Sequence, residues 1–323
     1  MNCISDTIRR DHSRPSCTSF DGGPTCALRP SNSTRTRGDE LIPLPKSVKR
    51  RLQPLRSLAR FVLGHQEERA RFELRANQRG TRRRCYICGK SFDHFYPYRG
   101  GSAEIPPFLL VLGIIGSDVD NFSCPHCRSF DRERHVAMYL DRLKLWDTIR
   151  MGAVLHIAPE RHLRDLIARL RPKEYVQGDM FPESPDVQKI DVTAIGYPAE
   201  HFDFVICNHV LEHVPEDRQA MRELYRVLKR GGNAVTQVPF STILTHSFED
   251  PGINTDELRS KFYGQEDHVR VYGQDVFERL KEVGFAVDLQ THQAVLADID
   301  PDLYGVNPRE DLILLTKSRD RGR

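Results

Sequence analysis

From residue 152 onward, short apolar runs alternate with segments of helical spacing. The runs at 154–157, 174–177, 202–207 and 234–238 have the length of buried strands. Between them, apolar residues recur every three or four positions, as they do on one face of a helix. Strands that alternate with helices predict an α/β fold with a doubly wound, Rossmann-like parallel sheet.

Local signals place the helices between these strands. Apolar spacing over 163–170 predicts one helix. In the next helix, Pro215 is expected in the first turn and Gly231-Gly232 at the end, because glycine readily adopts the left-handed cap conformation. A short third strand is expected over 189–192.

The end of the chain breaks this alternation. A helix over 274–283 is followed by strands near 285–291 and 311–316 with no helix between them. Such a pair predicts an antiparallel strand at the edge of the sheet. In open α/β sheets the ligand binds beyond the carboxyl ends of the strands, where the strand order reverses.

The first 84 residues differ from the rest in charge. They hold 19 Lys and Arg against 8 Asp and Glu, whereas the remainder holds 29 against 37. Residues 1–45 are poor in apolar side chains, which predicts disorder, and 47–79 have the spacing of a loose helix. This basic arm is interpreted as a solvated tail or as a contact for nucleic acid or another anionic surface.

Four of the eight cysteines form two pairs of metal-binding spacing. Cys85 and Cys88, and Cys124 and Cys127, each frame a C-x-x-C turn. Two such pairs can hold one structural Zn²⁺, although a redox pair is the alternative. The 35 residues between the pairs exceed the usual spacing, which indicates an insertion near 99–118. Cys207 lies in an apolar strand and is expected in the core.

These features divide the chain into four expected parts. They are a basic arm over 1–84, a Cys₄ module over 85–130, a connecting helix over 131–150 and an α/β domain over 151–323. The longest strongly apolar run, 108–116, is too short to span a bilayer, so no transmembrane segment is expected. The start of the chain lacks a secretory signal, which favours a cytoplasmic location.

One segment identifies a family. Residues 202–214 read FDFVICNHVLEHV, and 227–232 read VLKRGG, with Arg230 at a position that is proline in many relatives. The segment resembles the type 11 branch of the class I S-adenosylmethionine-dependent methyltransferases, and the likeness covers about 152–317. The resemblance implies S-adenosyl-L-methionine as cofactor and a Rossmann-like fold.

The resemblance also implies which residues bind the cofactor. Asp179 matches the acid that binds the ribose, Asp191 matches the acid at the adenine edge, and Asn208 lies at the mouth of the cleft. The loop after the first strand departs from the family pattern of an acid and three glycines, and holds instead His156, Ala158, Glu160 and His162. The chain resembles more closely a subfamily that has the same HVLEHV and VLKxGG blocks and a similar VLHxAPE segment in this loop.

A polar block over 262–273, FYGQEDHVRVYG, resembles a segment of the same subfamily. His268 is the candidate general base for an acceptor hydroxyl, with Asp267 as the residue that orients it. Arg270 and Tyr272 are candidate substrate-binding residues, because a guanidinium can hold an acidic group. The alternative is a loop that is fastened to the fold by its own hydrogen bonds.

Residues 209–213 spell H-x-x-E-H, the order of some zinc proteases. That motif requires a helix to bring both histidines to one face, but here it follows an apolar strand directly. We interpret the match as a coincidence. Glu212 and His213 are expected to brace the loop, and His209 is expected at the methyl-transfer pocket as a third candidate catalytic residue.

Three functions remain open at this stage. The first is methyl transfer to an oxygen or nitrogen of a small molecule or saccharide. The second is methylation of RNA, because zinc-bearing ribosomal RNA methyltransferases combine a cysteine module with this fold and the basic arm suits phosphate contacts. The third is a non-catalytic binding protein that retains the scaffold.

Overall fold

A seven-stranded sheet lies at the centre of the part of the chain that this computed structural model describes, residues 80–319. The strand order is β10-β11-β8-β7-β4-β5-β6, and β11 alone runs antiparallel to its neighbours. This mostly parallel sheet confirms the predicted α/β fold with a doubly wound sheet, and its antiparallel strand, β11, lies next to the edge strand β10. The strands are β4 (Ala153–Ile157), β5 (Glu174–Asp179), β6 (Gln188–Lys189), β7 (Phe202–Cys207), β8 (Leu228–Val235), β10 (Phe285–Gln290) and β11 (Leu312–Lys317).

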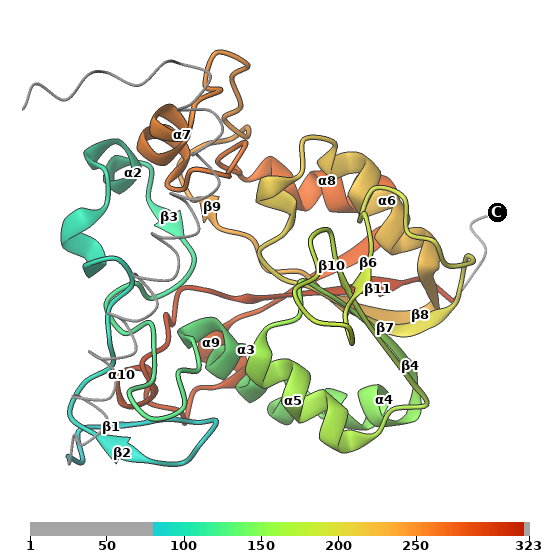
Figure 1. Cartoon of the computed structure of the whole chain (residues 1–323), viewed down its shortest axis with the longest axis horizontal. Helices are drawn as coiled ribbons and strands as arrows, with labels where there is room; N and C mark the ends of the chain where they lie inside the picture. Colours follow the sequence, from blue (N-terminus) through green and yellow to red (C-terminus); the bar gives the residue numbers. More distant parts are fainter. Residues whose placement is uncertain (1–79, 320–323) are drawn as a thin grey trace, which may run out of the picture. The chain divides into compact units, whose positions relative to one another are not determined.

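Helices cover both faces of the sheet (Figure 1). One face packs against α3 (Asp131–Arg142), α4 (Leu145–Met151) and α5 (Arg161–Leu170), and the other packs against α6 (Asp217–Val227) and α8 (Asp275–Val283). Because side chains alternate along a strand, β7 sends Phe204 and Ile206 to the first layer and Val205 and Cys207 to the second. Burial on both faces explains why this strand is apolar from Phe204 to Cys207.

The strand order reverses between β4 and β7. From β4 the chain proceeds outward to β5 and β6, and then returns to the other side of β4 to form β7 and β8. All five of these strands are parallel, so their carboxyl ends lie at one edge of the sheet. The crevice between the ends of β4 and β7 is therefore the expected ligand site.

Two helix predictions differ from the structure. The connecting helix expected over 131–150 is two helices, α3 and α4, because Lys144 between them has a left-handed backbone (φ 57°). Helix α6 ends at Val227 rather than at Gly231-Gly232, since Leu228 already pairs with Phe202 of β7. The two glycines lie inside β8, where the ladder with β7 shifts register.

Helix α6 begins later than expected, and strand β6 is shorter than expected. Pro215 precedes Glu216, the N-cap of α6, and so lies just outside the first turn. The strand expected over 189–192 is the two-residue β6, because the chain turns at Asp191, whose Oδ1 accepts the N–H of Thr193. The predictions for 163–170, 202–207 and 274–283 agree with α5, β7 and α8, and Cys207 is buried as expected.

The first cysteine pair lies in the turn of a short hairpin, and a longer segment separates this hairpin from the second pair. Strands β1 (Arg83–Arg84) and β2 (Ser91–Phe92) pair antiparallel. The insertion contains η1 (Gly101–Glu104), α2 (Pro107–Val111) and β3 (Ile114–Ile115), and β3 pairs with β9 (Phe240–Ser241). Helix α2 packs near α7 (Asp256–Tyr263) through a separate apolar cluster (Figure 1). Two short helices, α9 (His292–Val295) and α10 (Pro301–Tyr304), precede β11.

The predicted disorder of 1–45 and the predicted helical arm over 47–79 lie outside the described residues. Within residues 80–319, no helix is both long enough and apolar enough to cross a bilayer.

Candidate functional site at the carboxyl ends of the parallel strands

The candidate ribose-binding acid lies at the end of β5. Asp179 Oδ1 accepts the backbone N–H of Phe181 at 2.7 Å, which fixes the carboxylate in a turn. Met180 and Phe181, beside it, are both exposed, and the Phe181 side chain is 79% exposed. A large exposed aromatic side chain beside a fixed acid is suited to cover a flat ring, and sequence reasoning did not single out these two apolar residues.

Asp191 lies further along the same edge. Its Oδ1 accepts both the backbone N–H and the hydroxyl of Thr193, at 2.8 and 2.7 Å. These hydrogen bonds hold the pKa of Asp191 below its usual value, so the exposed carboxylate is ionised at neutral pH.

The loop after β4 has the backbone of a glycine loop without glycine. Ala158 has φ 48°, in the left-handed region that favours glycine, and its N–H donates to the carbonyl of Gly178 at 2.8 Å. Pro159 follows and has no N–H of its own. The chain therefore turns where the family places a glycine.

Two other substitutions in this loop pair with each other. His156 at the end of β4 is fully buried, and its Nε2 lies 2.8 Å from Oε2 of Glu160. Its Nδ1 lies 3.0 Å from the hydroxyl of Tyr175. Burial alone would raise the pKa of Glu160, but the hydrogen bond and charge of His156 outweigh it and hold that pKa below its usual value. The crevice thus contains a buried anionic carboxylate.

Glu160 also spans the point where the strand order reverses. The side-chain amide of Asn208, just after β7, donates to Glu160 Oε1 at 3.3 Å. Asn208 Oδ1 in turn accepts the N–H of Gln237 after β8, at 3.1 Å. One hydrogen-bonded chain therefore links the ends of β4, β7 and β8, and it brings Glu160 and Asn208 together as candidate cofactor-binding residues.

His209 lies beside this chain with one free ring nitrogen. Its backbone is left-handed (φ 52°) and its N–H donates to the carbonyl of Gln237 at 2.7 Å. Its Nδ1 lies 3.4 Å from Glu212 Oε1, and its Nε2 lies 3.9 Å from Glu310 Oε1. The buried Nε2 and Glu310 Oε1 have no hydrogen-bond partner. Burial raises the pKa of Glu310 to about 7.

The block over 262–273 is built differently from the prediction. His268 is buried, and its Nδ1 lies 3.0 Å from the carbonyl of Tyr263, which leaves Nε2 without a partner. Asp267 does not orient His268, because its Oδ2 lies beside Nδ1 of His213 at 3.3 Å. The prediction of an Asp267–His268 pair is wrong, since successive side chains in this loop point to different neighbours.

Arg270 and Tyr272 are fastened to the fold. Arg270 is 2% exposed, and all five of its N–H donors are used by Glu249 and by the carbonyls of Leu211, Val214 and Pro215. The Tyr272 hydroxyl is buried and donates to Asp217 at 2.9 Å. Neither side chain has a donor left for a substrate. Both residues therefore fit the alternative hypothesis, in which hydrogen bonds of this loop hold it against the rest of the fold.

The H-x-x-E-H segment is not an α-helix. Leu211–His213 forms a single 3-10 turn, η2, so the zinc-protease arrangement is absent, as expected. The turn nevertheless brings Glu212 and His213 to His268, and one candidate ligand atom of each residue lies within 4.8 Å of the others. Burial would raise the pKa of Glu212, but the hydrogen bond with His209 and three nearby imidazoles keep that pKa below its usual value.

The four paired cysteines converge as predicted. The Sγ atoms of Cys85 and Cys127 are 3.6 Å apart, and those of Cys88 and Cys124 are 3.9 Å apart. Both turns close in the same way, with the carbonyl of the first cysteine accepting the N–H of Gly89 (φ 71°) or Arg128 (φ 68°). Four sulfurs on the corners of a tetrahedron with 2.3 Å metal bonds lie about 3.8 Å apart, so the cluster has the size of a zinc site.

Glu133 and His162 connect the cysteine cluster to the loop after β4. Glu133 accepts the N–H of Phe130 at 2.7 Å and the N–H of His162 at 2.7 Å, so one carboxylate holds the starts of α3 and α5. His162 Nε2 lies 2.9 Å from the carbonyl of Cys127. Sequence reasoning missed the buried Glu133 and Glu310, because His162, which Glu133 contacts, and His209, which Glu310 approaches, are distant from them in sequence.

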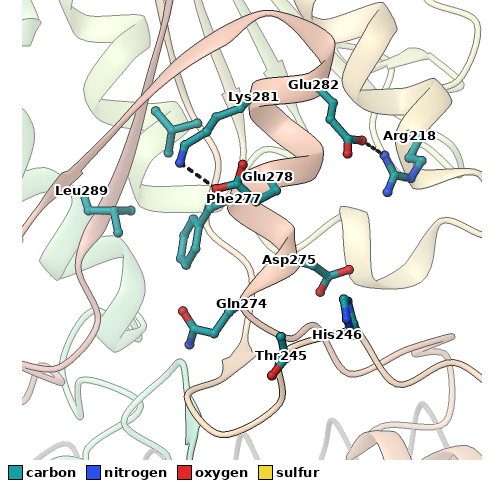
Figure 2. Close-up of a pocket in the computed structure, with 11 residues that line it drawn as sticks. Arg218, Thr245, His246, Gln274, Asp275, Phe277, Glu278, Lys281, Glu282 and Leu289 are labelled. Carbon is teal, nitrogen blue, oxygen red and sulfur yellow. Dashed lines mark hydrogen bonds and ion pairs between the residues drawn. The ribbon is translucent and has the colours of Figure 1, made fainter.

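An open cavity of about 600 Å³ lies elsewhere, along α8 and the edge strand β10. Figure 2 shows that ion pairs between Lys281 and Glu278 and between Arg218 and Glu282 border it. None of the predicted site residues lines this cavity.

Comparisons with known proteins give a family match within the α/β domain. Residues 151–236 match the sequence model of a family described as methyltransferase domain. An uncharacterized protein of Methanocaldococcus jannaschii is 34% identical over 101 residues, which are 31% of this chain and 46% of that protein. The chain thus spans about half the length of this curated relative.

Solved structures match a larger part of this chain than the curated relative does, but at lower sequence identity. An S-adenosylmethionine dependent methyltransferase of Mesorhizobium loti is 13% identical, with 55% of this chain and 96% of that chain covered and a TM-score of 0.38. A protein of Bacillus subtilis is 16% identical, with 56% and 94% covered and a TM-score of 0.36. The family match over 151–236 and the mostly parallel sheet that contains it support a class I S-adenosylmethionine-dependent methyltransferase domain in this chain.

Proposed function

We propose that this protein transfers a methyl group from S-adenosylmethionine to a small-molecule or saccharide acceptor. The observation that carries the proposal is the position of the polar network. Glu160 and Asn208 join the ends of β4 and β7 at the strand-order reversal, inside the segment that matches the methyltransferase family.

The side chains at this edge fit the cofactor. Asp179 offers a fixed carboxylate for the ribose diol, and Asp191 offers an ionised one for the adenine edge. The left-handed Ala158 gives the loop the turn that a close ligand requires. Glu160 supplies a buried negative charge, which suits a ligand with a cationic sulfonium and ammonium group. When bound, S-adenosylmethionine supplies the electrophilic methyl group.

His209 is the proposed proton acceptor for an acceptor hydroxyl. Glu212 beside Nδ1 favours the tautomer that carries its proton there, which leaves Nε2 free to accept a proton. Nε2 is buried, unpartnered and close to Glu310. His268 is a poorer candidate, because Asp267 pairs with His213 instead. Asn208 places His209 next to the cofactor network.

The four cysteines are proposed to hold a structural Zn²⁺. Four thiolates close the coordination sphere, so such an ion stabilises the module and takes no part in methyl transfer. Cys85 and Cys124 are fully buried, as expected of a closed site.

Calorimetric titration of the full chain with S-adenosylhomocysteine tests the proposed function. We expect micromolar binding that Asp179→Ala abolishes and Asp186→Ala, an exposed acid after the same strand, leaves intact. Absence of binding to folded wild-type protein would reject the enzyme and favour a non-catalytic scaffold. Methylation of RNA would require contacts from 1–84, of which residues 1–79 lie outside the described part of the chain.

A further inference from the structure

We propose that Glu212, His213 and His268 form a second metal site, for a divalent transition-metal ion and separate from the cysteine cluster. The three residues come from two segments that are more than fifty positions apart in sequence. One ligand atom from each, a ring nitrogen or a carboxylate oxygen, lies within 4.8 Å of the other two.

Two of the three side chains carry a buried atom with no partner. Glu212 is 1% exposed and His268 is 5% exposed. Glu212 Oε2 and His268 Nε2 make no hydrogen bond. A buried polar atom left without a partner costs about 1–3 kcal/mol, so proteins seldom keep two of them side by side. One shared cation would satisfy both atoms.

Each proposed ligand is also held by a second group on its other side. Tyr263 places its carbonyl 3.0 Å from His268 Nδ1, and Asp267 places Oδ2 3.3 Å from His213 Nδ1. The remaining oxygen of Glu212, Oε1, lies 3.4 Å from His209 Nδ1. Metal-binding histidines characteristically donate their second N–H to a carbonyl or carboxylate, which fixes the ring and directs the other nitrogen to the ion.

The two segments are aligned before any ion binds. The backbone N–H of Val269 donates to the carbonyl of Glu212 at 2.9 Å. The rings of His213 and His268 meet edge to face, with centroids 4.6 Å apart. A ligand set that the backbone already holds together loses little conformational freedom on binding.

The ligand set indicates the class of ion. Two imidazoles and one carboxylate suit Zn²⁺ or Fe²⁺ and do not suit Mg²⁺ or Ca²⁺, which prefer oxygen. Three protein ligands leave at least one coordination position for water, unlike the closed cysteine cluster. The His213 side chain is 30% exposed, so an ion can reach the site from solvent.

Metal content of the full chain tests this site. Wild type, His213→Gln, His268→Gln and the control His201→Gln are equilibrated with micromolar Zn²⁺, and bound zinc is counted by elemental mass spectrometry. His201 is a matched control, because it is similarly exposed and also pairs with an acid, Glu174. We expect His213→Gln and His268→Gln each to bind one zinc ion fewer per chain than His201→Gln.

Cobalt spectra separate the two sites. Co²⁺-loaded His213→Gln should lack the absorption of the ion at the histidine site that wild type shows. It should keep the thiolate charge-transfer band of the cysteine cluster. Equal zinc content in His213→Gln and His201→Gln would overturn the proposal, as would loss of the thiolate band alone. His213 is partly exposed, so this variant keeps the test valid even where His268→Gln fails to fold.

Discussion

His156 and Glu160 form a buried hydrogen bond at the carboxyl end of β4, with Nε2 and Oε2 2.8 Å apart. Related methyltransferases place an acid at the first position and a glycine at the second. In this chain the acid stands four residues later and reaches back to the strand end. The crevice thereby keeps an ionised carboxylate, paired with His156, although the usual acid is absent.

Glu160→Gln is expected to weaken binding of S-adenosylhomocysteine about tenfold, or by about 1.4 kcal/mol. The substitution keeps the size of the side chain but removes the charge that we propose attracts the cationic groups of the ligand. Calorimetric titration measures the change, and Glu183→Gln, at an exposed position after β5, should leave the affinity unchanged. Full affinity in Glu160→Gln would show that the carboxylate serves the fold alone.

The buried Glu310 is expected to make the free energy of unfolding depend on pH. Burial raises its folded-state pKa from 4.5 to about 7, so the native state binds this proton more tightly than the unfolded state. The free energy of unfolding should therefore fall as the pH rises from 4.5 to 7, by up to about 3 kcal/mol. Glu310→Gln cannot ionise and should escape this loss. Urea unfolding at both ends of the window measures it.

The control for this prediction is an acid with no burial. Glu183 is exposed, so Glu183→Gln should follow the wild-type pH profile. A constant difference between Glu310→Gln and wild type across the window would show that Glu310 does not titrate there.

Replacing Arg134 with lysine is expected to lower the free energy of unfolding substantially, although both side chains are cationic. It is fully buried, and its five N–H donors bind the carbonyls of five residues: Asn121, Phe122, Ser129, Tyr304 and Gly305. Lysine has no planar fork and leaves several carbonyls unpaired, so Arg134→Lys should cost about 3 kcal/mol or more. Arg161→Lys, at the exposed start of α5, should change stability by less than about 0.5 kcal/mol. Urea unfolding compares the two.

Lys144→Gly is expected to stabilise the protein. Lys144 is exposed and has φ 57°, a conformation that costs a non-glycine residue about 1–2 kcal/mol. Glycine removes this cost, and thermal unfolding should shift upward by about 2–4 °C. Lys173→Gly, at a residue without a left-handed backbone, should instead lower the midpoint. A lower midpoint in Lys144→Gly would contradict the strain argument.

The strands could be predicted well because burial on both faces leaves a continuous apolar run. Phe204–Cys207 and Ala153–Leu155 are such runs, and the structure places the two strands that contain them side by side at the centre of the sheet. Helix ends were less predictable. Val227 ends α6 because Leu228 joins the sheet, and pairing with β7 decides this rather than the glycines that follow.

In the candidate site too, some residues could be predicted from the sequence and others could not. The four cysteines could be found from spacing alone, because each pair sits on one local turn. Arg270 could not be judged from sequence, since the carbonyls that use its donors lie more than fifty residues away. The same distance hid the approach of His268 to Glu212.

The sequence by itself determined the alternation of strands and helices, the paired cysteines and the acids after β5, because these follow from local periodicity and short spacings. The tertiary structure decided which polar side chains retain free atoms. The donors of Arg270 and Tyr272 all bond to other parts of the fold. His209, Glu212 and His268 each retain one buried polar atom without a hydrogen-bond partner. The physical reason is that a buried polar atom bonds to whichever group lies near it in the folded structure. Residues that are near in space are often far apart in the sequence, so the sequence alone does not show which partner each atom has.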